Sequence, residues 1–141
     1  MAFRRGRLDD ARRGSDFRSR PILIIEDVPS VSAFLRVALE RKGYAVVPSS
    51  SGAEGLELLA TRHFRGVISD IRTPGGVNGA DIHAWILRHR PELCSRLIFI
   101  TGDLANSDTV ALLKQSGTPC VEKPFRVQQL ISLVEQTLGK P

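Results

Sequence analysis

Three carboxylates, one hydroxyl and one ammonium group stand close behind short apolar runs of this 141-residue sequence. Glu26 and Asp27 follow ILII, Asp70 ends VISD, Thr101 follows LIFI, and Lys123 comes two residues after TPCV. A buried carboxylate is costly unless a cation or hydrogen-bond donors pair with it. Each of these residues is therefore either a simple turn or cap residue or part of one shared site.

The apolar runs alternate with amphipathic segments over residues 21–139, and this alternation predicts an α/β fold. The expected strands are 22–25, 44–47, 66–69, 97–100 and 118–121, and the expected helices are 29–41, 52–61, 80–89, 104–115 and 126–138. Continuously apolar strands indicate a parallel sheet that is covered on both faces. We therefore expect a doubly wound (βα)5 three-layer sandwich, flavodoxin-like, with a central five-stranded parallel sheet.

The helix ends and the first helix can be predicted in more detail. Gly43 and Gly117 stand where a helix would end in a left-handed residue. The first expected helix carries one apolar stripe, which consists of Val31, Phe34, Leu35, Ala38 and Leu39. We expect this stripe to face the sheet.

The carboxyl ends of parallel strands meet at one edge of a sheet, where ligands bind in such folds. Three carboxylates at this edge would repel one another unless a cation were present. Mg2+ prefers oxygen ligands and is typically held by carboxylates together with a phosphate group. A site with carboxylates, a Lys and a Thr hydroxyl can receive a phosphoryl group, and Asp carboxylates do form acyl phosphates.

The same residues resemble a known family. The acidic pair after ILII, Asp70 of VISDIRTP, Thr101-Gly102 of LIFITG and Lys123-Pro124-Phe125 of VEKPF are similar to the motifs of response regulator receiver domains from two-component systems. The resemblance covers roughly residues 21–139. Each motif alone is weak, but their order and spacing together are specific.

The resemblance implies a role for each residue. Asp70 would accept a phosphoryl group from a sensor histidine kinase or a phosphotransfer protein, and Lys123 and Thr101 would contact that group. Such a domain is a signalling module, which catalyses only its own phosphorylation and dephosphorylation. Mg2+ would be held by Glu26, Asp27, Asp70 and the backbone carbonyl of Arg72.

The resemblance also implies an output. The phosphorylated domain would bind a downstream protein through the helices expected at 104–115 and 126–138, and homodimerisation through either helix stays open. Arg72 and Asp103 flank the site in the family's geometry, so we expect them to pair and slow the attack of water on the phosphoryl group. The sequence shows no DNA-binding domain after the receiver, which predicts a stand-alone protein, with a piece of a larger protein as the alternative.

Two positions depart from the family pattern. Cys120 stands where the family usually has Phe or Tyr, and it is interpreted either as a small buried residue or as a redox-active thiol. Pro74 stands at the family's place, but Gly79 comes one residue later than usual. Together with Gly75 and Gly76 it predicts a locally altered turn.

Net charge and composition limit the classes of partner and the cellular location that the sequence allows. The net charge of +5 is carried mostly by residues 1–20, whose seven Arg and three Asp give +4, so residues 21–141 contribute only +1. The basic balance is therefore poor evidence that the domain binds nucleic acid. We expect residues 1–20 to be a disordered arm, with an anion-binding or localisation role as the alternative. No apolar run approaches the roughly 20 residues that span a bilayer, and the two cysteines form no CxxC pair, so we expect a cytoplasmic protein.

Other functions fit the residues less well. A haloacid-dehalogenase-type phosphatase needs a second Asp two residues after its nucleophile, where this chain has Arg72. A flavodoxin-like nucleotide site needs a Ser/Thr/Gly-rich loop after the first strand, where this chain is acidic. A phosphorylation-independent pseudo-receiver would have lost an Asp or the Lys. His63, His83 and His89 have no metal-ligand spacing and are interpreted as surface or boundary residues.

Overall fold

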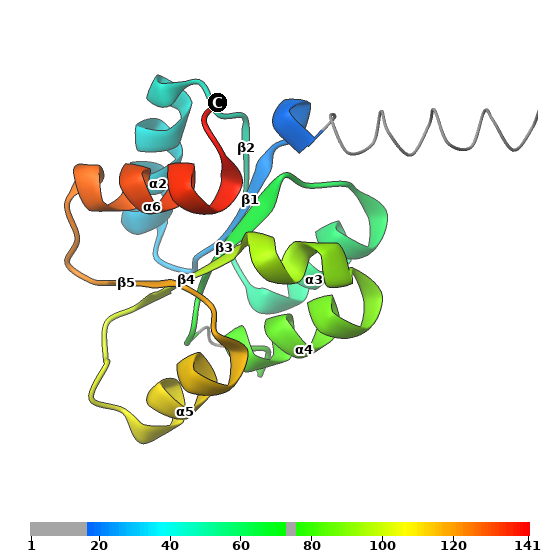
Figure 1. Ribbon diagram of the computed structural model, residues 1–141, viewed down its shortest axis with the longest axis vertical. Coiled ribbons are helices and arrows are strands. Elements are labelled where there is room, and N and C mark those ends of the chain that lie inside the picture. Colours follow the sequence, from blue (N-terminus) through cyan, green and yellow to red (C-terminus); the bar gives the residue numbers. More distant parts are fainter. Residues whose placement is uncertain (1–16, 73–75) are drawn as a thin grey trace, which may run out of the picture.

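A computed structural model describes residues 17–72 and 76–141, and it has three layers (Figure 1). The five strands are all parallel and lie in the order β2-β1-β3-β4-β5. They are β1 (Ile22–Ile25), β2 (Val46–Ser49), β3 (Gly66–Asp70), β4 (Leu97–Thr101) and β5 (Cys120–Glu122). This order and the alternating helices confirm the expected doubly wound (βα)5 sandwich.

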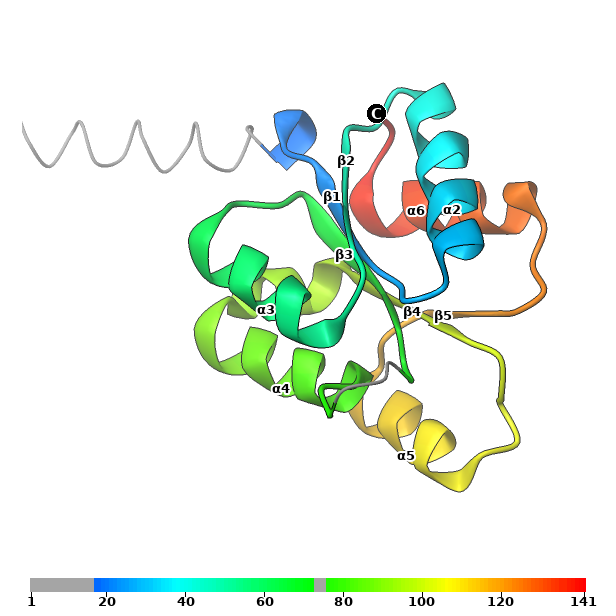
Figure 2. The ribbon, with the colours of Figure 1, turned by 180° about the vertical axis from the view of Figure 1, so that it is seen from behind.

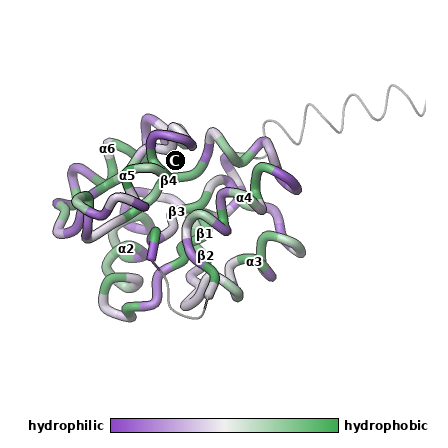
Figure 3. Tube along the Cα trace, turned by 90° about the horizontal axis from the view of Figure 1, so that it is seen from below, coloured by the Kyte–Doolittle hydropathy of each residue, from purple (hydrophilic) through white to green (hydrophobic). Residues whose placement is uncertain are grey.

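In the described part of the chain, α-helices cover both faces of the sheet, as the views from the front and from behind show (Figures 1 and 2). One face carries α2 (Pro29–Lys42) and α6 (Val127–Leu138). The other face carries α3 (Gly52–Thr61), α4 (Gly79–His89) and α5 (Ser107–Ser116). Hydrophilic and hydrophobic residues alternate along these helices (Figure 3), which leaves one side of each helix for the sheet.

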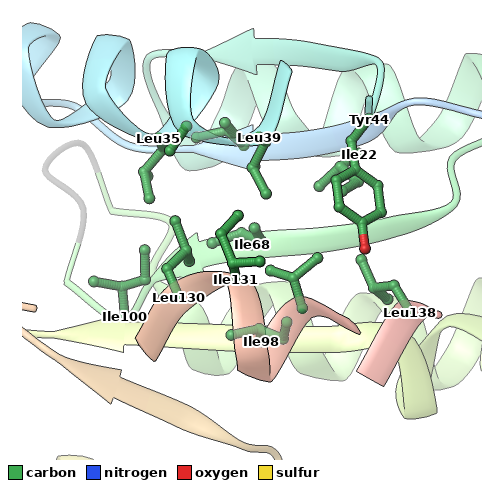
Figure 4. Packing of buried hydrophobic residues seen from close by; sticks show 13 residues of the cluster. Ile22, Leu35, Leu39, Tyr44, Ile68, Ile98, Ile100, Leu130, Ile131 and Leu138 are labelled. Carbon is green, nitrogen blue, oxygen red and sulfur yellow. The ribbon is translucent and has the colours of Figure 1, made fainter. Parts of the chain in front are cut away.

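Two hydrophobic clusters separate the three layers. On the α2/α6 face, Leu35 and Leu39 of α2 meet Ile22 and Ile68 of the sheet, and Leu130 of α6 closes the cluster (Figure 4). On the other face, buried residues of β1, β3 and β4 pack against α3 and α4. The strands are buried on both faces, which is why their sequences are continuously apolar.

Local chemistry explains where the elements begin and end. Gly43 and Gly117 follow α2 and α5 with φ of +106° and +67°, which confirms the predicted left-handed ends. The helix expected from residue 104 begins only at Ser107, because Asn106 accepts the N–H groups of Asp108 and Thr109 and caps it there.

Two strands differ from the prediction by two residues. The strand expected at 44–47 lies at Val46–Ser49, because Tyr44 instead packs in the core and donates its hydroxyl to the carbonyl of Gly139 (2.6 Å). The strand expected at 118–121 is Cys120–Glu122, since Pro119 has no N–H with which to extend the ladder.

Two further expectations need correction. The disordered arm was expected through residue 20, but Phe17–Ser19 form a short 3-10 helix, η1, and the rest of that arm, residues 1–16, lies outside the described residues. Phe34 was expected to face the sheet, but it is 42% exposed and its ring lies against Phe125 instead. Among the described residues, no helix is long and apolar enough to cross a membrane.

Candidate functional site

The loops after β1, β3, β4 and β5 bring the predicted polar residues together at the carboxyl edge of the sheet. Lys123 lies between two carboxylates: its Nζ is 2.7 Å from Oδ2 of Asp70 and 3.0 Å from Oε2 of Glu26. One carboxylate oxygen from each of Glu26, Asp27 and Asp70 lies within 4.8 Å of the others. The three acids thus form one cluster with one ammonium group beside it.

Burial sets the electrostatics of this cluster. Burial raises the pKa of Glu26, which is 1% exposed, and hydrogen bonds from Lys123 and from the Val28 N–H (3.2 Å) offset only part of that effect. Burial by itself would lower the pKa of Lys123, but hydrogen bonds to Asp70 and Glu26 outweigh it and raise that pKa. Three ionised carboxylates and one ammonium leave two negative charges uncompensated, which favours a divalent cation.

Asp70 is the last residue of β3, and its side chain is 10% exposed. Its Oδ1 accepts the backbone N–H of Arg72 (3.2 Å), and its Oδ2 accepts Lys123. One oxygen of Asp70 therefore caps the turn after β3 while the other pairs with Lys123, so the residue belongs to the turn and to the cluster at once. These two interactions offset the free-energy cost of burying the Asp70 carboxylate at the end of an apolar strand.

The first acidic pair does not cap the helix that follows it. Val28 is the N-cap residue of α2, no side chain caps this helix, and Pro29 occupies its first turn. Glu26 instead turns toward Lys123, and Asp27 is half-buried beside it. The capping interpretation is therefore wrong for both acids, which remain available to a cation.

Thr101 ends β4 at the same edge, and its side chain is buried. Its Oγ1 accepts the backbone N–H of Asp103 (3.1 Å), and its backbone carbonyl accepts the N–H of Lys123 (2.7 Å). Thr101 thus links the loop after β4 to the start of the loop that carries Lys123.

Arg72 and Asp103 lie on the outer side of the cluster. Nη2 of Arg72 is 4.0 Å from Oδ2 of Asp103, and their side chains are 61% and 48% exposed. The structure thus shows the expected pair. Pro74 and Gly75 lie outside the described residues, whereas Gly76 has a left-handed φ of +87°.

The glycine that comes one residue late has a packing role. A Cβ on Gly79 would lie 2.9 Å from the Cα of Ile71 and 3.0 Å from the ring of Phe99. The N–H of Gly79 also donates to the carbonyl of Ile71 (2.7 Å). The start of α4 is therefore pressed against the end of β3, directly behind Asp70.

Cys120 is a half-buried residue of β5 and not an activated thiol. Burial, followed by the nearby charges of Glu122 and Asp70, raises the pKa of its thiol to about 11. A thiol with so high a pKa carries almost no thiolate at neutral pH, which favours the structural interpretation over the redox one.

Sequence reasoning missed a hollow beside the acidic cluster and an apolar groove on α2. One has a volume of about 320 Å³ and is lined by Glu26 and Asp27 on one side and by Ser50 and Glu54 on the other. The other is an apolar groove of about 590 Å³ on α2, which contains Phe34, Val37 and Val127. Phe34 lies on the apolar stripe of the first expected helix, and that stripe is a sequence signal for the groove.

Potential metal ligands cluster at one place in the described part of the chain. Among the residues that the structure describes, Glu26, Asp27 and Asp70 are the one group of at least three potential ligands. His63 instead lies at the surface, where Nη1 of Arg90 is 3.3 Å from its Nδ1. An all-oxygen cluster fits a hard cation such as Mg2+ and not a soft metal.

Comparison with known proteins agrees with this geometry. The model of the response regulator receiver domain family matches residues 22–135, so the chain belongs to that family. The response regulator ArlR of Staphylococcus aureus is 28% identical over 119 residues, which are 84% of this chain and 52% of ArlR. The chain therefore spans about half the length of the curated relatives it matches.

Solved structures are similar to the whole sandwich. A CheY-like receiver domain from Methanospirillum hungatei superposes with a TM-score of 0.76 at 23% identity, over 84% of this chain and 93% of that one. The response regulator TrrA of Thermotoga maritima, whose structure is a complex with Mg2+-BeF, has a TM-score of 0.72 at 25% identity. That likeness covers 84% of this chain and 99% of TrrA.

Proposed function

We propose that this receiver domain accepts a phosphoryl group on Asp70 from the phosphohistidine of a histidine kinase or a phosphotransfer protein. The observation that carries the proposal is the contact of Lys123 with Asp70 at 2.7 Å, inside a cluster of three carboxylates. A carboxylate held beside an ammonium and a cation site is poised for phosphoryl transfer, which depends mainly on positioning and charge neutralisation.

The proposed metal ligands are Glu26, Asp27, Asp70 and the backbone carbonyl of Arg72. When bound, Mg2+ would neutralise charge on the phosphoryl oxygens during transfer. Glu26 already shares Lys123 with Asp70, so a bound cation would relieve the excess negative charge that burial makes costly.

The transfer itself needs few groups. A carboxylate oxygen of Asp70 attacks phosphorus and forms a new P–O bond, while the P–N bond to the donor histidine breaks and its electron pair stays on the imidazole. Lys123 holds the carboxylate in place beforehand and can then donate to the phosphoryl oxygens. Thr101 would follow by turning its hydroxyl from the Asp103 N–H toward the phosphoryl group.

The donor protein would approach over the apolar groove of α2. A second hollow, lined by Phe34, Lys123 and Phe125, continues this groove to the acidic cluster. Phe34, Val37 and Val127 are each between 41% and 43% exposed, so an apolar partner surface could cover them close to Asp70.

The downstream protein would bind α5 and α6, the two helices that follow Thr101 and Lys123 in the chain. A change at Thr101 reaches both loops, because its carbonyl and hydroxyl bond to Lys123 and Asp103. We propose that phosphorylation changes how this face binds a downstream protein.

The test is intact mass after incubation with acetyl phosphate and Mg2+. The wild-type chain should gain about 80 Da, the mass of one phosphoryl group, and the gain should be absent without Mg2+ and in Asp70→Asn. Lys123→Gln should reduce the yield strongly while leaving Mg2+ binding in place. Beryllofluoride binding serves as the second readout, because a short-lived adduct would escape the mass measurement.

The alternative is a phosphorylation-independent pseudo-receiver. A folded wild-type chain that neither gains mass nor binds beryllofluoride would establish that alternative and reject the phosphoryl-acceptor proposal.

A further inference from the structure

The amino edge of the sheet, opposite the acidic cluster, gathers arginines from four separate parts of the chain. They come from η1 and the residue after it, from the loop between α3 and β3, from the end of α4, and from the 3-10 helix η2 (Pro91–Arg96). We define the arginine face as Arg18, Arg20, Arg62, His63, Arg90 and Arg96. Arg20, Arg62, His63 and Arg90 line one shallow hollow, and Glu92 is the one carboxylate among the described residues that lines it.

Aromatic rings hold several of these guanidinium groups in place. Arg20 and Arg96 lie over the ring of Phe17 at 4.7 and 4.3 Å from its centroid, and Arg62 lies 5.7 Å from that of Phe64. Ordered guanidinium groups lose less conformational entropy on binding an anion than mobile ones do.

The cations on this face repel one another. Burial first, and then the charges of Arg65 and Arg20, lower the pKa of Arg96. Burial and the charge of Arg18 likewise lower the pKa of Arg65, which lies beneath the face. No ion pair between described residues includes any arginine of this face. A bound anion would relieve this repulsion.

A purely structural role accounts for only part of the face. Arg65 and Arg96 donate to carbonyl groups at the end of α6 and in the chain beyond it, which satisfies those acceptors. Arg18 and Arg62 are exposed, and Nη1 of Arg90 lies 3.3 Å from Nδ1 of the exposed His63. The outer arginines are therefore accessible to a binding partner.

The chemistry of the face favours a phosphodiester backbone over a lipid surface. All of its permanent cations are arginines, whose planar groups bind phosphate through two hydrogen bonds. Membrane-surface binding also needs exposed apolar side chains. The apolar residues of this hollow, Phe17, Phe64 and Leu93, are not among the exposed large hydrophobic residues.

We infer that the arginine face binds the phosphate backbone of a nucleic-acid duplex without base specificity. Guanidinium groups spread over several loops match a polyanion with regularly spaced charges better than a single small anion. In the sequence, residues 1–16 precede Phe17 and contain five Arg and three Asp, a net charge of +2. This site lies at the opposite end of the strands from Asp70, so it does not depend on the proposed phosphorylation.

The experiment measures fluorescence anisotropy of a labelled DNA duplex of about 20 base pairs with the full chain, as a function of salt concentration. Four phosphate contacts predict a slope of log K against log salt of roughly −3.6. Arg62→Gln combined with Arg90→Gln should flatten the slope by about 1.8 and weaken binding roughly tenfold or more at about 50 mM salt. The matched control, Lys114→Gln with Arg126→Gln, removes the same charge from exposed positions elsewhere and should change the slope little.

Other results would overturn the inference. These are no binding by the wild-type chain at about 50 mM salt, an equal loss in both double variants, or full retention in the Arg62/Arg90 variant. Tight binding to phosphatidylserine vesicles that duplex DNA does not compete away would assign the face to a membrane instead. Thermal unfolding of each variant verifies folding, and the single variant Arg62→Glu, at an exposed site, repeats the test should the double variant fail to fold.

Discussion

Lys123 forms ion pairs with two carboxylates at once, and this sharing determines the charge balance at the site. Its ammonium contacts Glu26 and Asp70 at 3.0 and 2.7 Å, while Asp27 forms no ion pair with another described residue. The site is thus too negative by itself and well suited to a divalent cation and a phosphoryl group. Lys123, the residue after β5, therefore couples the acid that follows β1 to the acid that ends β3.

We predict that the Arg72–Asp103 pair prolongs the lifetime of the phosphorylated state. We expect Arg72→Ala to speed dephosphorylation roughly two- to fivefold, since an exposed pair at 4.0 Å is weak and would shield the phosphoryl group from water only in part. Loss of phosphate is followed by mass after acetyl phosphate is removed.

The control for this prediction is Arg36→Ala, which breaks another exposed ion pair, with Glu40 at 3.4 Å, on α2. An unchanged rate in Arg72→Ala, or an equal change in Arg36→Ala, would contradict the proposed shielding.

Cys120 gives a prediction about pH. Because its thiol has a pKa of about 11 instead of 9.0, its thiolate fraction near pH 8 should be about 100-fold lower than that of an unperturbed thiol. Alkylation by iodoacetamide, followed by peptide mass analysis, should therefore be slow in the folded chain and rise with pH up to about 11. Fast labelling of the folded chain at pH 7 would disprove this assignment, and urea-unfolded protein provides the reference rate.

At the scale of elements, α6 can approach the sheet closely because Gly66 has no side chain. A Cβ on Gly66, the first residue of β3, would overlap Leu138 of α6 and lie 2.8 Å from the carbonyl of Arg96. Both neighbours belong to packed elements, so neither can give way cheaply.

We therefore expect Gly66→Ala to lower the free energy of unfolding by about 1–3 kcal/mol, as overpacking of a core does. Gly102→Ala is the matched control, because a Cβ there meets nothing within 4 Å. Urea unfolding compares the two variants, and equal stabilities would show that α6 can shift without cost.

At the scale of the whole molecule, Arg65 ties distant parts of the chain together. Its buried guanidinium donates to the carbonyls of Leu138 (3.1 and 3.2 Å), Gly139 (3.0 Å), Lys140 (2.5 Å) and Arg18 (3.3 Å). It also lies 4.9 Å from the centroid of the Tyr44 ring. One side chain thus joins η1, the start of β3 and the chain that follows α6.

Replacing Arg65 by Gln should remove the hydrogen bonds that this guanidinium donates, although Arg96 still donates to the Leu138 carbonyl and Tyr44 to that of Gly139. We expect the free energy of unfolding to fall by about 2–4 kcal/mol, because several hydrogen bonds and the packing of the buried side chain are lost together. Arg62→Gln, three residues earlier and exposed, should change stability by less than about 0.5 kcal/mol. Urea unfolding measures both variants, and a small effect at Arg65 would mean that water replaces its bonds.

Local patterns in the sequence determined the elements and their order. The 3.6-residue period, the continuously apolar runs and the glycines at 43 and 117 depend only on neighbours in the chain, so they could be read directly. The alternation of strands and helices then implied a parallel sheet. That in turn placed Glu26, Asp27, Asp70, Thr101 and Lys123 at one edge.

Only the tertiary structure decided which side chains meet. That Lys123 lies between Glu26 and Asp70, that Phe34 is exposed beside Phe125, and that arginines from four segments gather at one end all depend on contacts between residues far apart in the chain. Composition showed a net charge of only +1 for residues 21–141, because the acids of one edge cancel the arginines of the other in the sum. Charges that cancel in a sum still act separately in space, since each field falls off over about 10 Å in salt solution.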